Sequence, residues 1–415
     1  MIIGVPKETF PGERRVALIP ASVKQLKKLG LELLVESGSG ESAGFPDSMY
    51  EEAGATVTSS RDEVFSKSSI LAMVRAATAN PELGQADIER FKEGQVVIAQ
   101  CDPLWDPPAT VALAGRKAII FALELVPRIT RAQSMDVLSS MATIAGYKAV
   151  LMAANLSPQM FPMSMTAAGT LTPARVFILG VGVAGLQAIA TAKRLGAVVR
   201  AYDIRPEVKE QVESLGGKFV EMDLKQESGE GGYAKEMGEE KLKRQRELML
   251  EVVAESDVVI TTAAIPGRKS PILVTADMVE AMPPGSVLID LGAERGGNCE
   301  LTESGETCVK HGVTIVGPCN VASDVPRHAS QMYANNITTF LKSIVKDGHL
   351  SLDMTDEVIA GTLITHRGEV PHPKVRELAG LGPLTKEPEP PSPISNLDEE
   401  EDPENPPPDT YKLQR

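Results

Sequence analysis

The feature that most constrains the fold is a glycine turn, Gly180-Val-Gly182-Val-Ala-Gly185, between an apolar run and a helical pattern. Residues 175–179 carry the β-branched and aliphatic side chains of a strand, and residues 184–195 have the apolar spacing of a helix. A strand, a glycine turn and a helix in this order are typical of a Rossmann βα unit. The chain is therefore predicted to contain a parallel sheet covered by helices.

The three glycines differ in what they permit. Gly180 allows a tight turn, Gly182 lets the backbone approach a pyrophosphate, and Gly185 lets the helix pack closely on the strand. The helix begins near Val183 and Ala184, and its first N–H groups lie at the positive end of the helix dipole, where they can bind phosphate. We therefore expect these five residues to bind a dinucleotide.

An acidic residue at the end of the next predicted strand indicates which dinucleotide binds. Asp203 follows Gly180 by 23 residues, and a carboxylate there can accept hydrogen bonds from both ribose hydroxyls. This favours NAD(H), because the carboxylate would repel a 2′-phosphate. Arg205 instead favours NADP(H), since an arginine near this position can pair with the 2′-phosphate. We include Asp203, Ile204 and Arg205 in the expected cofactor site.

A second glycine pattern is not expected to bind a nucleotide. Gly38-Ser-Gly40-Glu-Ser-Ala43 also follows a predicted strand. However, Gly44 and Pro46 interrupt the helix that should come next, and no acidic residue ends a following strand at the right distance.

Alternating strand and helix patterns cover two blocks of the chain, at about 1–125 and 173–316. We predict an α/β protein with two Rossmann-like doubly wound domains, a cleft between them, and long helices that join them at about 134–154 and 329–345.

The expected domain boundaries follow from these blocks. The first Rossmann-like domain is expected at 1–135, completed by 325–380, and the NAD(H)-binding Rossmann domain at 150–318. Residues 386–415 are rich in Pro, Glu and Asp, which predicts a disordered acidic tail that cannot bury enough apolar surface to fold.

Composition excludes some functions. The net charge is −14, and phosphate contacts need a basic face, so nucleic acid is not an expected partner. The cysteines contain no C-x-x-C pair, so no metal site is expected. We see no secretory leader and no window of about 18 apolar residues. These observations predict a cytoplasmic chain that does not span a membrane.

A second group of polar residues precedes the predicted joining helix. It reads Arg128-Ile129-Thr130-Arg131-Ala-Gln133-Ser-Met-Asp136-Val-Leu-Ser139. Asp136 and Ser139 are three residues apart and share one face if the segment is helical. From spacing alone the segment is either a capped helix start with solvated charges or part of a site.

The sequence resembles the NAD(H)-binding alpha component of proton-translocating transhydrogenases, a family that is similar to alanine dehydrogenase. The resemblance covers roughly residues 1–380. It is carried by Ile3-Gly-Val-Pro-Lys-Glu, Glu13-Arg-Arg-Val-Ala, the Arg128 to Ser139 segment, the glycine turn, Gly231-Gly-Tyr-Ala-Lys-Glu-Met and Gly296-Gly-Asn-Cys-Glu.

The resemblance implies roles for several residues. Arg128, Gln133, Asp136 and Ser139 match the residues that hold the nicotinamide and face a partner's NADP(H), and Ile129, Thr130 and Arg131 lie between them. Gly232 and Tyr233 match a mobile loop over the nucleotide, whose glycines permit motion. Gln245 and Ala264 match further positions along the cofactor cleft.

The resemblance also implies partners. The chain would be a homodimer, with residues 163–173 as an exchanged hairpin. It would work with a membrane subunit and an NADP(H)-binding subunit, as a Re/Si-specific, proton-translocating NAD(P)+ transhydrogenase active only with those partners. It would be peripheral to the inner (plasma) membrane through them.

Two alternatives stay open. The first is an NAD-dependent dehydrogenase like alanine dehydrogenase, whose substrate lysine and histidine correspond to the segments Met73-Val-Arg75-Ala-Ala and Ile98-Ala-Gln-Cys-Asp. Neither signature residue is present, whereas Arg15 matches a substrate arginine that both groups keep. Hydride transfer between two nicotinamides needs apposition but no acid or base, which favours the transhydrogenase. The second alternative is a nucleotide sensor without catalysis.

Overall fold

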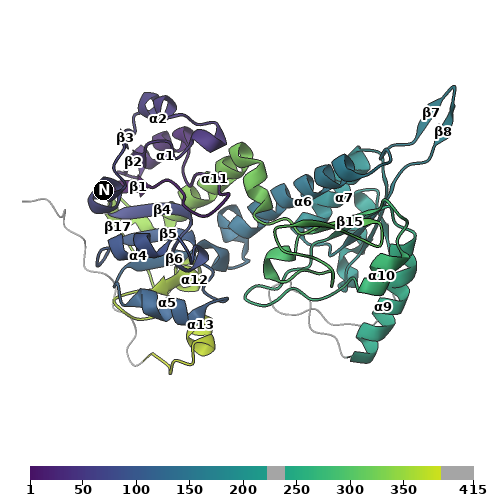
Figure 1. The fold of residues 1–415 in the computed structure, drawn as a ribbon. Coiled ribbons are helices and arrows are strands. Elements are labelled where there is room, and N and C mark those ends of the chain that lie inside the picture. The colour runs from purple at the N-terminus through teal and green to yellow at the C-terminus, as the bar shows by residue number, and fades with distance from the viewer. Residues whose placement is uncertain (222–238, 385–415) are drawn as a thin grey trace, which may run out of the picture.

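The protein has two lobes, each built on a seven-stranded sheet, in a computed structural model that describes residues 1–221 and 239–384 (Figure 1). Helix α6 (Val137–Leu156) runs from the first lobe to the second, and α11 (Pro326–Ile344) returns the chain to the first. The first lobe therefore contains both early and late parts of the sequence.

The sheet of the first lobe has the strand order β18-β6-β5-β4-β1-β2-β3. Strands β1 to β6 are parallel to one another, and β18 pairs antiparallel with β6 at one edge. The strands are β1 (Ile2–Val5), β2 (Glu32–Glu36), β3 (Thr56–Thr58), β4 (Ile70–Arg75), β5 (Val96–Gln100), β6 (Ile119–Ala122) and β18 (Leu363–Thr365).

Helices cover both faces of this sheet, which is why its central strands are apolar on both sides. In β4, Ile70, Ala72 and Val74 belong to one core, and Leu71 and Met73 belong to the other. The first core is completed by α1 (Val23–Lys28), α2 (Asp47–Ala53), α11, α12 (Glu357–Thr362) and the start of α6. The second is covered by α3 (Arg61–Lys67), α4 (Gln85–Arg90), α5 (Pro107–Ala114) and α13 (Pro373–Leu378).

The second sheet has the order β11-β10-β9-β12-β13-β15-β14. All its pairs are parallel except the edge pair β14–β15. The strands are β9 (Arg175–Leu179), β10 (Val198–Tyr202), β11 (Lys218–Phe219), β12 (Val258–Thr261), β13 (Val287–Asp290), β14 (Thr307–Lys310) and β15 (Val313–Val316). Helices α7 (Val183–Arg194) and α8 (Lys209–Ser214) cover one face, and α9 (Glu239–Ala254) and α10 (Ala276–Ala281) cover the other.

Two small hairpins lie outside these sheets. Strands β7 (Ser164–Thr166) and β8 (Gly169–Leu171) pair only with each other and project from the second lobe (Figure 1). Strands β16 (Val345–Lys346) and β17 (His349–Leu350) form the other hairpin after α11.

The predicted fold class is confirmed, because two mostly parallel sheets alternate with helices along the chain. The edges differ from the prediction. Strands β14 and β18 are antiparallel additions of four and three residues, too short to give a periodic signal. The second glycine pattern leads into a short 3₁₀ turn (Glu41–Ala43) that ends at Gly44, as its sequence indicates.

Helix α6 contradicts one expectation, because its length and composition would suit a membrane span, with a mean hydropathy of 1.4 over 18 residues. Its apolar side chains are used within the fold. Val137, Met141 and Ile144 belong to a core of the first lobe, and Ala149, Val150 and Ala153 belong to a core of the second. The apolar run thus reflects a helix shared by two cores.

Gly146 lies where α6 meets the start of α7. A methyl group there would be 2.1 Å from the Ala184 carbonyl oxygen, far inside van der Waals contact. We expect Gly146→Ala to lower the free energy of unfolding by about 1–3 kcal/mol, although alanine favours helix by about 1 kcal/mol. Urea denaturation checks this. Gly361→Ala in α12, where the nearest atom is 3.5 Å away, is the matched control and should be neutral or stabilising. An unchanged midpoint for Gly146→Ala would contradict the close contact.

Candidate functional site

A cleft of about 930 Å³ lies between the lobes, at the carboxyl ends of strands from both sheets. Its second-lobe wall comes from the turn after β9, the end of β10 and the loop after β12. Its first-lobe wall comes from the ends of β4, β5 and β6 and from the start of α6. Ligands of open α/β sheets bind at this edge.

The glycine turn has the geometry that its sequence predicts. Gly180 has φ +92°, which side chains rarely adopt, and a methyl group on it would lie 2.7 Å from Thr262 Oγ1. A methyl group on Gly185 would lie 2.0 Å from the Gly180 carbonyl oxygen. At Gly182 no atom lies within 4 Å of that position, so the backbone there faces open space in the cleft.

The start of α7 is suited to an anion. Gly182 is the N-cap residue and supplies no side-chain hydrogen bond, so the N–H groups of the first turn have no side-chain cap. Helix α7 has 12 residues, and Val183 and Ala184 line the cleft beside its first turn. The chemistry of this end matches a pyrophosphate group, which N–H groups and the helix dipole stabilise.

Asp203 and Arg205 form a close ion pair at the end of β10. The Asp203 residue is 8% exposed and lines the cleft with Ile204 and Arg205. Arg205 Nε lies 2.9 Å from Asp203 Oδ1, and Arg205 Nη2 lies 3.0 Å from Oδ2. The hydrogen bonds to Asp203 raise the pKa of Arg205, so the guanidinium keeps its charge.

The loop after β12 is held by buried polar side chains. Asn298 Oδ1 accepts a hydrogen bond from the Ala263 N–H at 3.1 Å, and Asn298 Nδ2 donates to the Ala263 carbonyl at 2.9 Å. Asp290, fully buried, accepts hydrogen bonds from the Asn298 N–H at 2.7 Å and from Thr261 Oγ1 at 2.8 Å. These contacts fix Ala264, which lines the cleft.

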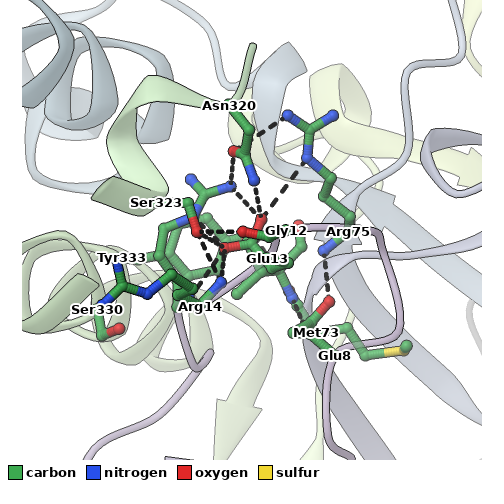
Figure 2. Close-up of polar contacts among 12 residues, drawn as sticks. Glu8, Gly12, Glu13, Arg14, Met73, Arg75, Asn320, Ser323, Ser330 and Tyr333 are labelled. Carbon is green, nitrogen blue, oxygen red and sulfur yellow. Dashed lines mark hydrogen bonds and ion pairs between the residues drawn. The ribbon is translucent and has the colours of Figure 1, made fainter. Parts of the chain in front are cut away.

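A polar cluster supports the first-lobe wall (Figure 2). Arg75 ends β4 and lines the cleft, and its Nη2 donates to Asn320 Oδ1 at 3.2 Å. Asn320 Nδ2 donates to Glu13 Oε2 at 3.0 Å, and Glu13 also binds Arg15 at 2.6 and 2.7 Å. Glu8 accepts from the backbone N–H groups of residues 74 and 75 at 2.6 and 3.1 Å. The cluster therefore orders the chain on both sides of Arg75.

The buried carboxyl groups of this lobe differ in charge. Burial opposes ionisation of Glu13, but the Arg15 guanidinium outweighs it and lowers the pKa of Glu13 to about 2. Burial, together with the nearby Glu13 carboxylate, raises the pKa of Glu8 to about 8. Burial likewise raises the pKa of Glu124, beside the cleft, to about 7. Two of these carboxyl groups thus hold a proton near neutral pH.

Contacts across the cleft mouth join the two lobes. Arg295 Nη2 donates to Asp102 Oδ2, and its guanidinium lies 4.3 Å from the centre of the Trp105 ring. Arg75 Nη2 lies 3.5 Å from Glu294 Oε1. Asp102 has φ +58°, an unfavourable conformation for a non-glycine residue, and its N–H donates to Glu124 Oε1.

The Arg128 to Ser139 segment contributes only in part to the cleft. Arg128 and Ser139 line it. Asp136 is the N-cap of α6 and accepts hydrogen bonds from the Ser139 N–H at 2.9 Å and from Ser139 Oγ at 2.5 Å. Asp136 and Ser139 therefore meet through a helix cap, and not as two positions on one helix face, because α6 begins only at Val137.

The other residues of the segment lie elsewhere. Residues 130–135 form a 3₁₀ helix before the cap. Gln133 is exposed, and Ile129 and Thr130 do not line the cleft. Arg131 binds Asp356 of the first lobe at 2.8 Å. The segment is thus a capped helix start whose two ends face the cleft.

Two residues of the expected site, Gly232 and Tyr233, lie outside the described residues. A third, Gln245, lies in α9, where only its backbone is described. Ala264, the last of the expected set, is in the cleft.

Sequence reasoning missed several polar residues that line the cleft. They are Arg75, Gln100, Asp102, Glu124, Glu294 and Arg295. A signal for them existed, because polar side chains at the carboxyl ends of buried parallel strands gather at one edge of the sheet. Among the described residues, no group of three or more His, Cys, Asp or Glu side chains is placed to hold a metal ion.

Two family matches cover most of the chain. Residues 4–145 match "Alanine dehydrogenase/PNT, N-terminal domain", and residues 149–373 match "Alanine dehydrogenase/PNT, C-terminal domain". An NAD(P) transhydrogenase subunit alpha of Rhodospirillum rubrum is 50% identical over 379 residues, which are 90% of this chain and 98% of that protein.

A solved structure and a more distant relative place the chain within that family. The crystal structure of transhydrogenase from Sinorhizobium meliloti matches with a TM-score of 0.79 and 46% identity, over 89% of this chain and 100% of that chain. Alanine dehydrogenase 2 of Staphylococcus aureus is 29% identical over 91% of this chain and 96% of its own length. The chain therefore belongs to the alanine dehydrogenase/PNT family, and within it to the group formed by NAD(P) transhydrogenase alpha subunits.

Proposed function

We propose that this chain is the NAD(H)-binding component of a proton-translocating NAD(P) transhydrogenase. The observation that carries the proposal is the cleft, in which the glycine turn of one lobe faces Arg128 and Ser139 of the other. In bound NADH the reduced nicotinamide supplies a hydride, which would pass to NADP+ on a partner subunit.

The chain's own residues would bind and orient the dinucleotide. The N–H groups at the start of α7 would hold the pyrophosphate, and Asp203 would bind the adenosine ribose. Arg128 and Ser139, on the opposite wall, would orient the nicotinamide end. Gln133 and Asp136 are proposed with them on resemblance. The lobes would exclude water from the cleft.

The polar lining suits transfer without an acid or base. Within the described part of the chain, no histidine or lysine lines the cleft. Glu124 is the acidic group whose pKa of about 7 could serve proton transfer, but its Oε1 is held by the N–H groups of Cys101 and Asp102. Its Oε2 is buried and has no hydrogen-bond partner among the described residues. We therefore assign Glu124 a structural role.

An amino acid dehydrogenase is less well supported. The segments that correspond to those of the substrate lysine and histidine, residues 73–77 and 98–102, reach the cleft with Arg75, Gln100 and Asp102 but contain neither a lysine nor a histidine. Arg15 is 3% exposed and holds Glu13 in a bidentate contact. A nucleotide sensor would use the same cleft and is separated from the proposal only by a test of hydride transfer.

We propose that the chain is a homodimer that also binds a membrane subunit and an NADP(H)-binding subunit. The β7–β8 hairpin supports the dimer. It exposes Met163, Met165 and Leu171 at 60%, 76% and 49%. An isolated two-stranded hairpin is marginally stable in water, so contact with a second chain would stabilise it. The complex would hold the chain at the inner membrane surface.

Hydride transfer tests the proposal directly. We expect the pure chain, mixed with the NADP(H)-binding component of a transhydrogenase, to reduce an NADP+ analogue with NADH, measured by absorbance. Arg128→Ala should lower the rate by about tenfold or more, because it removes a charged contact at the nicotinamide end. Arg90→Ala is the control, since Arg90 binds Asp62 at 2.7 Å on the first-lobe surface.

Two outcomes would contradict the proposed transhydrogenase function. NADH binding without any hydride transfer would favour the sensor. Alanine-dependent reduction of NAD+ by the chain alone would favour the amino acid dehydrogenase.

The buried carboxyl group of Glu124 predicts a pH dependence of stability. Its pKa rises from 4.5 in the unfolded chain to about 7 in the fold, so the folded state binds the proton more tightly. The resulting stability is complete below about pH 4.5 and is lost as the pH rises through about 7.

Thermal unfolding between pH 5 and 8 measures this loss. Glu124→Gln should reduce the fall in Tm between pH 5 and pH 8 by about 2–5 °C. Glu8, whose pKa is about 8, should leave a residual slope at higher pH. Glu306→Gln, an exposed acid on the second lobe, serves as the control and should follow the wild-type curve. Identical curves for Glu124→Gln and wild type would exclude a raised pKa at Glu124.

The hairpin predicts the oligomeric state. The double substitution Met165→Asp and Leu171→Asp should turn a dimer into a monomer in sedimentation equilibrium, because charges would be buried in the contact. Val309→Asp is the control, since Val309 is 66% exposed on β14 and lies outside the β7–β8 hairpin. A dimer that survives the double substitution would place the interface elsewhere.

A further inference from the structure

All hydrogen-bond acceptor positions of Asp203 are in use. A carboxylate has about four such positions, two on each oxygen. Asp203 Oδ1 accepts from the Arg205 N–H at 2.9 Å and from Arg205 Nε at 2.9 Å. Asp203 Oδ2 accepts from the Val181 N–H at 2.7 Å and from Arg205 Nη2 at 3.0 Å. A ribose that binds this carboxylate must therefore replace a donor.

The four donors are of two kinds. The N–H groups of Val181 and Arg205 belong to the backbone of the turn and of the strand end, and they fix the carboxylate. The two guanidinium donors belong to one side chain, and each occupies one position on a different oxygen. The two neighbouring hydroxyls of a ribose need the same pair of positions.

We propose that the Arg205 guanidinium is an internal substitute for the ribose diol, which occupies Asp203 when the cleft is empty and is displaced when NAD(H) binds. The inference rests on the proposed function, in which the cleft takes NAD(H). It makes Arg205 a competitor of the cofactor's adenosine ribose, so that removal of Arg205 strengthens binding.

The displacement requires little movement of the backbone. The Arg205 side chain is 21% exposed and lies in the loop between β10 and α8, so it can turn towards solvent. The contact from the Arg205 N–H to Asp203 can persist, which keeps the carboxylate aimed into the cleft. The exchange replaces two contacts between opposite charges with two hydrogen bonds from uncharged hydroxyls to the carboxylate, and it therefore lowers the net affinity for the dinucleotide.

The same geometry predicts different effects of Arg205 on the binding of NADH and of NADPH. A 2′-phosphate would meet the Asp203 carboxylate, and the paired guanidinium is the nearby positive charge that could offset the repulsion. Removal of Arg205 should therefore act in opposite directions, strengthening the binding of NADH and weakening that of NADPH.

Calorimetric titration of the full chain tests the inference. The variants are Arg205→Ala and Arg205→Lys, because lysine keeps the charge but cannot bind both oxygens as a fork. We expect both to bind NADH about three- to tenfold more tightly than wild type. Arg200→Ala is the matched control, since Arg200 is also on β10 but binds Glu255 at 2.7 Å, outside the cleft.

A second ligand shows whether the diol is responsible. An NADH analogue that lacks the 2′- and 3′-hydroxyls of the adenosine ribose cannot replace the guanidinium, so Arg205→Ala should change its affinity by less than about twofold. A similar gain for both ligands would overturn the inference, because the effect would then be independent of the diol.

Other outcomes also decide. Weaker NADH binding by Arg205→Ala would make Arg205 a direct ligand, and unchanged binding would mean that no competition exists. Either result overturns the inference while NADH binding by the wild-type chain leaves the proposed function standing. Absence of NADH binding by the wild-type chain would instead overturn the proposed function. Thermal unfolding of the cofactor-free variants checks that each is folded.

Discussion

The structure depends on the burial of one helix, α6, in two cores. Its first half contributes Val137 and Met141 to the first lobe, and its second half contributes Val150 and Ala153 to the second. Between them Gly146 lets the helix approach the start of α7. The cap of α6 at Asp136 and the N-terminal end of α7 therefore share one rigid support, and the two walls of the cleft are placed by the same contact.

The local parts of the site could be predicted from the sequence. The Gly180 turn and the position of Asp203 depend on backbone conformation and on spacing within about 25 residues, which a single βα unit determines. The fold class was predictable for the same reason, because buried parallel strands and their helices leave distinct patterns. Ala264, by contrast, was placed by resemblance.

The rest of the cleft depends on contacts between distant segments. Arg75, Glu124 and Glu294 each lie at or shortly after the carboxyl end of a strand, which the sequence could indicate, but no local pattern shows that the two sheets bring these ends together at one cleft. The spacing of Asp136 and Ser139 suggested one helix face, but the helix begins between them, and a cap forms instead. The hydrogen bonds that occupy the acceptor positions of Asp203 could not be predicted either. The sequence shows that a carboxylate is present but not which donors already bind it.

The path of the chain through the first lobe has a consequence for synthesis. Strand β18 completes the first sheet beside β6, and Thr365 Oγ1 donates to the Ala118 carbonyl across 247 residues. The Val16 N–H likewise donates to Ser330 Oγ across 314 residues. A ribosome must therefore release the whole second lobe before the first can close. Until then an apolar sheet edge and face stay uncovered, and exposed surface of this kind is prone to aggregation.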